Sequence, residues 1–187
     1  ARAVERRGGV IYERTAVEDF RPGKRPALVT GRGEVRARAV VLAGEAYLAR
    51  LRRTHRQVLP IYSLIVLTEP LPPERWEEIG WGRHECLSSC RLSVDYLSRT
   101  EDGRILFGGR GAPYRLGSSI RDEYDRDEAT HAMLRRSLVE WFPALRGVRF
   151  THAWGGPIGV KRDWMPTAAY DPASGVAAAY GYAGQGV

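Results

Sequence analysis

Strand-like patterns dominate the first part of the chain. The residues GVIY at 9–12 predict a first strand. The strand-like segment ALVT at 27–30 and an alternating pattern at 34–37 flank the segment GRG at 31–33, which predicts a hairpin with a glycine-rich turn. The unbroken apolar run VVLA at 40–43 predicts a strand that is buried on both of its faces.

A short helix is expected directly after this run. Gly44 ends the strand, and residues 45–51 have the composition of a helical turn. The order of hairpin, buried strand, glycine and helix is typical of the edge of a nucleotide-binding α/β domain. We therefore expect a unit of this kind to contribute the first part of the chain.

The middle of the chain predicts an antiparallel sheet. Residues 61–71 form a strand rich in β-branched and aromatic residues, and residues 74–79 predict a short helix. Residues 91–111 give the clearest hairpin, with the pair DG at 102–103 as its turn. Its first strand alternates apolar residues with polar ones, and we expect the apolar side, Leu92, Val94 and Tyr96, to be the buried face.

One long helix and a final strand pair complete the pattern. Asp125 or Asp127 is a candidate cap for a helix that runs to about residue 142, where a proline follows. Its apolar stripe consists of Leu134, Leu138 and Trp141. Strands are expected at 148–154 and 175–180, with a glycine-rich and charged loop at 155–166 between them. The fold class is therefore α+β.

Charge and cysteine content exclude little by themselves. The net charge of +7 and the sequence pI of about 9.8 leave open a basic nucleic-acid-binding module without enzymatic activity. The arginines, however, are scattered among acidic residues, which favours a solvated surface. Cys86 and Cys90 follow His84 without the spacing of a metal site, so we assign no metal and expect reduced thiols in a cytoplasmic protein.

Neither a membrane span nor a leader is evident, and the ends of the sequence look internal. No run of 18 apolar residues occurs. The chain begins without methionine or the apolar stretch of a signal peptide. It stops on GYAGQGV at 181–187, where a helix would be expected to follow. We expect a piece of a longer protein.

The terminal segment GYAGQGV has two interpretations. Glycines allow positive φ and let backbone approach a ligand closely, so the loop and a following helix would present N–H groups to an anion or a polarised carbonyl. A tight turn with only a structural role is the other interpretation. The spacing matches neither G-x-G-x-x-G nor a P-loop.

The order of segments resembles a known family. The motifs are TEPL at 68–71, DGRILFGGR at 102–110, FPAL at 142–145, WGG at 154–156 and GYxGxGV at 181–187. Together they resemble the FAD-dependent oxidoreductases of the D-amino-acid oxidase and glycine oxidase superfamily, in the branch of gamma-glutamylputrescine oxidase-like amine oxidases. The resemblance extends from about residue 9 to residue 187.

The resemblance implies a division of the chain around FAD. Residues 1–58 would be a partial FAD-binding domain, 59–150 an antiparallel-sheet substrate domain, and 151–187 a return to the FAD-binding domain. The N-terminal segment with the dinucleotide-binding glycines would be missing. The implied cofactor-binding residues, whose loop N–H groups would stabilise the reduced flavin, are Ala43, Gly44, Trp154, Gly155, Gly181, Tyr182, Ala183, Gly184, Gln185, Gly186 and Val187.

The implied reaction is oxidation of the C–N bond of an amine or amino acid to an imine, with hydride transfer to flavin. The implied substrate-binding residues are Tyr62, Tyr96, Arg110 and Lys161, and no catalytic residue is assigned. The Arg-Pro pair of glycine oxidases is missing, which argues against an α-amino acid as substrate. The isolated chain is expected to bind FAD poorly and to be inactive. One subunit of a split flavoenzyme is a further alternative.

Overall fold

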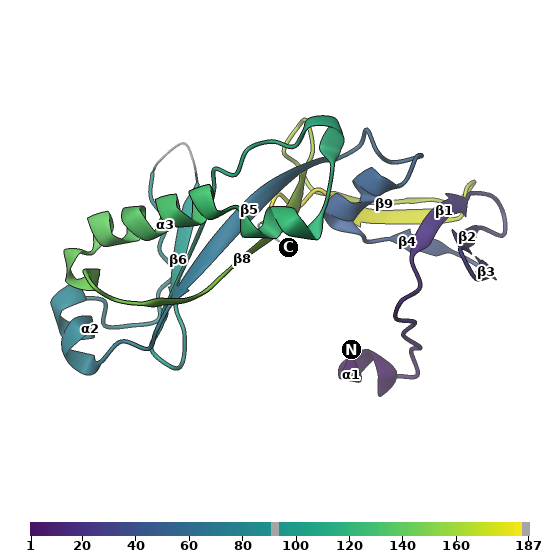
Figure 1. Ribbon diagram of the computed structural model, residues 1–187. Helices are drawn as coiled ribbons and strands as arrows, with labels where there is room; N and C mark the ends of the chain where they lie inside the picture. The colour runs from purple at the N-terminus through teal and green to yellow at the C-terminus, as the bar shows by residue number, and fades with distance from the viewer. Residues whose placement is uncertain (91–93, 185–187) are drawn as a thin grey trace.

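The structure is a computed structural model that describes residues 1–90 and 94–184, without the side chain of Arg110. The molecule is elongated (Figure 1). A long sheet covered by the helix α3 lies at one end, and two small sheets lie at the other. The N-terminal helix α1 (Arg2–Glu5) lies apart from all of these sheets and buries none of its residues.

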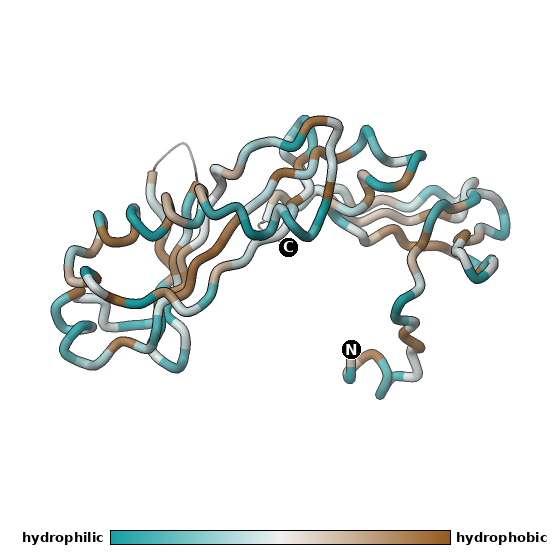
Figure 2. The backbone as a smooth tube through the Cα atoms, in the orientation of Figure 1, coloured by the Kyte–Doolittle hydropathy of each residue, from teal (hydrophilic) through white to brown (hydrophobic). Residues whose placement is uncertain are grey.

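The long sheet has four antiparallel strands in the order β6-β7-β5-β8. These strands are β5 (Leu59–Thr68), β6 (Asp95–Arg99), β7 (Ile105–Arg110) and β8 (Phe150–Val160). Alternate residues of β5 are buried, including Leu64 and Val66, which are fully covered. Figure 2 shows that hydrophobic stretches concentrate on the central strands of this sheet. The sheet therefore buries one face in the main core and leaves the other less covered.

Helix α3 (Glu128–Trp141) forms because its sequence supplies a cap, an apolar stripe and a stop. Asp127 caps the helix, since its carboxylate accepts a hydrogen bond from the N–H of Thr130 at 3.0 Å. Leu134 and Leu138 are buried in the main core against the sheet. The helix ends where Pro143 begins the 3-10 turn η4 (Pro143–Leu145). The predicted helix and its stripe are confirmed.

Shorter elements close the ends of this core. Helix α2 (Pro73–Ile79) buries Trp76, and its left-handed C-terminal residue is Gly80. The 3-10 turns η2 (Leu116–Ser118) and η3 (Asp122–Arg126) precede α3.

Two three-stranded sheets lie at the other end of the molecule. One is antiparallel, in the order β1-β2-β3, and the second has the order β4-β10-β9, in which β10 pairs parallel with β4 and antiparallel with β9. Their strands are β1 (Val17–Arg21), β2 (Ala27–Thr30), β3 (Gly33–Arg36), β4 (Val40–Leu42), β9 (Thr167–Asp171) and β10 (Val176–Tyr180). A second hydrophobic core joins these sheets to the 3-10 helix η1 (Glu45–Arg50). The parallel pairing brings residues from opposite ends of the chain together.

Two expectations for the first part of the chain are wrong. Residues 9–12 belong to no strand, and Val10 and Tyr12 are 72% and 75% exposed, because β-favouring residues need a paired neighbour to form a strand. The run at 40–43 is not buried on both faces, since Val41 is 64% exposed while its neighbours Val40 and Leu42 are buried. Strand β4 therefore has one face packed in the second hydrophobic core and the other face exposed.

The end of the chain also pairs differently from the expectation. Residues 155–160 are strand, because β8 continues along β5 as far as Val160. The strands at 150–160 and 176–180 do not pair with each other; β8 joins the long sheet and β10 lies between β4 and β9. Glycines in a strand carry no apolar alternation, so neighbouring strands decide their conformation. The division into domains remains a prediction, and the pairing favours a return point after β8.

The buried side of β6 is opposite to the expected one. Asp95 and Leu97 are buried, whereas Val94 and Tyr96 are 40% and 36% exposed; Leu92 lies outside the described residues. The burial of Asp95 is compensated by a hydrogen bond from the N–H of Ser89 at 2.9 Å. An aromatic and an aliphatic side chain are thereby left on the less covered face of the sheet.

The predicted α+β class, with an antiparallel sheet and helices, is confirmed. Among the described helices none is long and apolar enough to cross a membrane. Within residues 1–90 and 94–184, no group of three or more His, Cys, Asp or Glu side chains is placed to hold a metal ion. Cys86 and Cys90 are free and exposed.

Candidate functional site

The less covered face of the long sheet, which we call the open face, is defined by the strand register. Residues that pair across an antiparallel ladder share one face. The paired residues of this face on β5 and β8 are Ile61 with Ile158, Ser63 with Gly156, and Ile65 with Trp154. Trp154 is 37% exposed. Helix α3 packs with the opposite, buried face, so the open face is available to a ligand.

Tyr96 lies flat across the open face. Its strand β6 is separated from β5 by β7, yet its hydroxyl reaches Ser63 Oγ at 3.2 Å. The ring passes directly over Gly108, where a Cβ atom would lie 2.4 Å from the ring carbon Cζ. Glycine at this position is therefore what lets the tyrosine reach across an intervening strand.

A cavity of about 510 Å³ opens beside this tyrosine. Its lining comes from the open face, the turn between β8 and β9, and the loop after β10: Ser63, Val94, Tyr96, Ile158, Trp164, Ala183 and Gly184. The walls are mainly apolar, and their polar side-chain groups are the hydroxyls of Ser63 and Tyr96 and the indole N–H of Trp164. Such a cavity, mostly apolar with a few converging polar groups, has the character of a small-molecule site.

The loop after β10, residues 181–184, is held by protein acceptors. The N–H groups of Gly181 and Tyr182 donate to the carboxylate of Glu45 at 2.7 and 3.1 Å. The N–H of Ala183 donates to the carbonyl of Gly159 at 3.3 Å. Both Gly181 and Gly184 have positive φ, at 79° and 86°. Any backbone donation from this loop to a ligand therefore begins at Gly184.

Lys161 lies under the same loop. A Cβ atom on Gly181 would lie 2.5 Å from Lys161 Cδ, so the lysine stem packs closely against the glycine. Its Nζ forms an ion pair with Asp163 at 3.2 Å. A hydrogen bond from the N–H of Met165 lowers the pKa of the Asp163 carboxyl most, and the hydrogen bond and charge of Lys161 lower it further. The amine of Lys161 thus has a carboxylate partner within its own loop.

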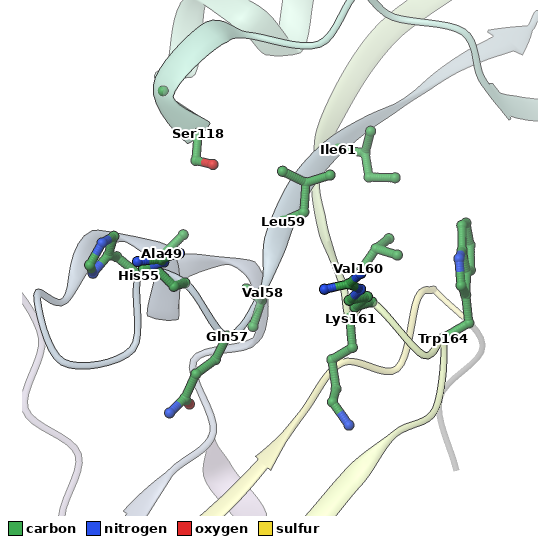
Figure 3. Close-up of a pocket in the computed structure, with 13 residues that line it drawn as sticks. Ala49, His55, Gln57, Val58, Leu59, Ile61, Ser118, Val160, Lys161 and Trp164 are labelled. Atoms are coloured by element: carbon green, nitrogen blue, oxygen red, sulfur yellow. The ribbon is translucent and has the colours of Figure 1, made fainter.

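A second cavity of about 680 Å³ adjoins the first, and Trp164 lines both (Figure 3). Ile61 of the open face also lines it. Four basic residues contribute to this lining: His55, Arg56, Lys161 and Arg162. The apolar side chains of Leu59 and Val160 line the same cavity.

The predicted substrate residues are not all brought together. Tyr96 and Lys161 line the two adjoining cavities. Arg110 pairs with Ser63 in the ladder between β5 and β7. Tyr62 lies on the buried face, 3% exposed, where its hydroxyl accepts from the N–H of Arg121 at 3.1 Å. Burial raises the pKa of this phenol.

The predicted cofactor residues fall into three groups. Trp154 lies on the open face, whereas Gly155 lies on the buried face, where a Cβ would lie 2.9 Å from Leu64 Cγ. Ala43 and Gly44 connect β4 to Glu45, beside the loop. Residues 181–184 form the loop itself, and Gln185, Gly186 and Val187 lie outside the described residues.

Sequence reasoning missed three residues of the site. Ser63 lies at an open-face position of β5, and strict alternation along β5 was the signal that would have identified it. Gly108 shares its glycine pair with Gly109, and only the tertiary contact distinguishes it. Glu45 was included only in the expected helix, although it is a carboxylate directly after the strand-ending Gly44.

The site fits a flat ring system such as a flavin. Apolar side chains and an exposed tryptophan form one broad surface, and the loop beside it carries two glycines that allow close backbone approach. These features are common to many aromatic ligands, so the site alone leaves the identity of the ring open.

Comparison with known proteins supplies that identity. All residues from 1 to 187 match the model of the family described as FAD dependent oxidoreductase. A probable oxidoreductase OrdL of Rhizobium meliloti is 33% identical over 189 residues, which cover 100% of this chain and 41% of the relative. A gamma-glutamylputrescine oxidoreductase of Escherichia coli is 28% identical over 168 residues, covering 89% of this chain and 37% of the relative. The chain spans less than half the length of these relatives.

Solved structures share the fold. A glycine oxidase from Bacillus cereus has a TM-score of 0.74 at 19% identity and covers 98% of this chain and 48% of its own. An L-proline dehydrogenase from P. horikoshii has a TM-score of 0.73 at 18% identity, covering 96% of this chain and 47% of its own. Since the family match extends over all 187 residues, the chain belongs to the FAD dependent oxidoreductase family, whose cofactor is FAD.

Proposed function

We propose that the protein to which this chain belongs oxidises the C–N bond of an amine or amino acid to an imine, which water hydrolyses. The observation that carries the proposal is the cavity between the open face and the glycine loop. It places two hydroxyl groups and apolar walls beside the loop of residues 181–184, within a chain of an FAD dependent oxidoreductase family. FAD, when bound, accepts the hydride from the carbon that bears the nitrogen.

The residues of this chain have distinct roles in the proposal. The hydroxyls of Tyr96 and Ser63 hydrogen-bond and orient the substrate, because both line the first cavity and lie within 3.2 Å of each other. Trp154 and Ile158 cover the reacting region with apolar surface and exclude water. The loop of residues 181–184 and the connection at Ala43 and Gly44 contact the cofactor.

The basic second cavity supports a subsidiary role in substrate binding. Arg162 and Lys161 line it, and Arg110 pairs with Ser63 in the ladder between β5 and β7. These cations would attract an acidic group on the part of the substrate that does not react. The names of two similar proteins, a gamma-glutamylputrescine oxidoreductase and a glycine oxidase, support an amine or amino acid as substrate class.

Three related expectations remain predictions. The first is the division into a partial FAD-binding domain at 1–58, a substrate sheet at 59–150 and a returning cofactor segment at 151–187. The second is that this chain alone binds FAD poorly and lacks activity, since it spans 41% and 37% of two relatives. The third is a cytoplasmic location.

Anaerobic flavin reduction tests the proposed reaction. The FAD-loaded full-length protein is mixed with a panel of primary amines, secondary amines and amino acids, and flavin absorbance is followed while the carbonyl product is trapped. Matched alcohols and 2-hydroxy acids serve as controls. Bleaching by a nitrogen compound with formation of the carbonyl product supports the proposal. Bleaching by the oxygen analogues alone overturns it.

A further inference from the structure

We propose that Glu45 is a positioning residue that holds the glycine loop 181–184 in the conformation that receives the cofactor. The inference rests on the proposed function in that it takes this loop to face FAD. The two residues that Glu45 holds, Gly181 and Tyr182, are 136 and 137 positions away in the sequence. A single side chain therefore ties the end of β4 to the end of β10.

The contact between Glu45 and the loop is bidentate, since each carboxylate oxygen accepts one hydrogen bond. The N–H of Gly181 donates to Oε2 at 2.7 Å, and the N–H of Tyr182 donates to Oε1 at 3.1 Å. Hydrogen bonds from backbone amides to an ionised carboxylate are stronger than bonds between neutral groups. Engaging two consecutive N–H groups fixes the orientation of the peptide between them.

Two backbone features show that the fold is built around this carboxylate. Glu45 has a φ of 47°, in the left-handed region that non-glycine residues rarely occupy. At Gly159 a Cβ atom would lie 2.8 Å from Glu45 Oε2, so only glycine leaves room for the carboxylate there. The position of the Glu45 carboxylate explains both the strained backbone at residue 45 and the requirement for glycine at residue 159.

The position of the carboxylate has an electrostatic consequence for a bound cofactor. The N–H groups of Gly181 and Tyr182 donate to the Glu45 carboxylate, and the N–H of Ala183 donates to the carbonyl of Gly159, so none of the three is left to donate to a cofactor. A negative charge behind the loop opposes the negative charge that reduction places on a flavin. Glu45 thus defines the shape of the loop and also lowers the reduction potential at the site.

The test uses Glu45→Gln in the FAD-loaded full-length protein, with Glu45→Asp as the charge-preserving variant. Glu78→Gln is the matched control, since it removes one surface carboxylate of an ion pair with Arg75. Three properties are measured: the midpoint potential of the flavin, the dissociation constant of FAD, and amide hydrogen exchange at Gly181 and Tyr182 in the FAD-free protein. None of them requires turnover.

In Glu45→Gln the side-chain amide has one oxygen, so one loop N–H loses its acceptor. We expect exchange at these amides to become at least about tenfold faster and FAD to bind about tenfold to hundredfold more weakly. The midpoint potential should move to more positive values, because the negative charge is gone. In Glu45→Asp the potential should stay near that of the unmodified protein while FAD binding weakens, because the charge remains but the reach is shorter.

A second route to the same disruption is Gly159→Ala, whose methyl group would enter the space of the carboxylate. It should reproduce the faster exchange and the weaker FAD binding. If Glu45→Gln changes potential and FAD affinity no more than Glu78→Gln does, the proposal is overturned. Failure of every amine to reduce the flavin would refute the proposed reaction instead, and would leave these three measurements interpretable.

Discussion

The ring of Tyr96 lies over Gly108 so closely that a Cβ atom on the glycine would be 2.4 Å from both Cζ and the hydroxyl oxygen. The two residues face each other across β6 and β7. This arrangement carries the tyrosine hydroxyl over a whole strand to Ser63 on β5. A glycine in a strand, which by itself weakens the strand, here makes room for a side chain of the candidate site.

Substitution of Gly108 by alanine should displace the Tyr96 ring. The added methyl group would overlap the ring, and overpacking of this kind costs about 1–3 kcal/mol in free energy of unfolding. The hydrogen bond to Ser63 would be lost at the same time. Urea denaturation measures the stability, and the intrinsic fluorescence of the tyrosine and the nearby tryptophans reports the displacement.

Gly156→Ala provides the control for this prediction. Gly156 pairs with Ser63 on the same face, but a Cβ atom there would have no heavy atom within 4 Å. Its stability should change by less than about 0.5 kcal/mol, as is usual for substitutions into open space. Equal losses in the two variants would show that the tyrosine contact is not the reason.

Removal of the Tyr96 hydroxyl should affect substrate binding more than stability. The hydroxyl bonds to Ser63 Oγ on an accessible face, so Tyr96→Phe should cost at most about 1 kcal/mol in unfolding free energy. Under the proposed function, KM for the amine should rise about fivefold or more. Tyr170→Phe serves as control, because this tyrosine is exposed on β9 in the second small sheet. An unchanged KM in Tyr96→Phe would remove Tyr96 from the substrate site.

Leu138 is the residue of α3 whose truncation should be most damaging. It is fully buried between the helix and the long sheet, and Leu138→Ala should destabilise the protein by about 2–5 kcal/mol. Met133 lies on the same helix but is 36% exposed, so Met133→Ala should cost much less. Thermal unfolding of the two variants side by side measures the difference. Similar losses would contradict the assignment of the buried face.

Asp127 should contribute stability that depends on pH. The N–H of Thr130, more than any other group, lowers the pKa of its carboxyl in the folded protein, and the Thr130 hydroxyl and Arg115 add to this. A lowered folded pKa gives stability that is present above the ordinary value of about 3.9 and is lost as the pH falls through the folded value. Asp127→Ala should therefore cost about 1–2 kcal/mol at pH 7.

The difference in free energy of unfolding between Asp127→Ala and the unmodified protein should shrink below about pH 4. At that pH the Asp127 carboxyl of the unfolded chain begins to be protonated, while that of the folded protein is still ionised. Urea denaturation at a series of pH values measures it. Glu140→Ala, which removes an exposed carboxylate near the other end of α3, should show no such narrowing. A constant difference across the acid range would refute the charged cap.

Local sequence determined the elements that carry their own signals. Helix α3 could be predicted because a cap, an apolar stripe and a terminating proline all lie within about five turns of chain. The hairpin of β2 and β3 has its glycine turn in place, and the turn at Gly103 joins β6 to β7. The motifs from 68–71 to 181–187 also sufficed for the family, which the comparisons confirm.

Tertiary structure decided what depends on residues far apart in the sequence. Asp95 is buried and Tyr96 is exposed, because the N–H of Ser89 donates a hydrogen bond to the Asp95 carboxylate. The alternation of apolar and polar residues along the strand could not predict this partner. Likewise, β8 extends through its glycines because β5 lies beside it. The contact of Glu45 with the loop joins residues 136 positions apart, so no local pattern could predict it. Periodicity identifies elements, but long-range hydrogen bonds and close packing select their faces and assemble the site.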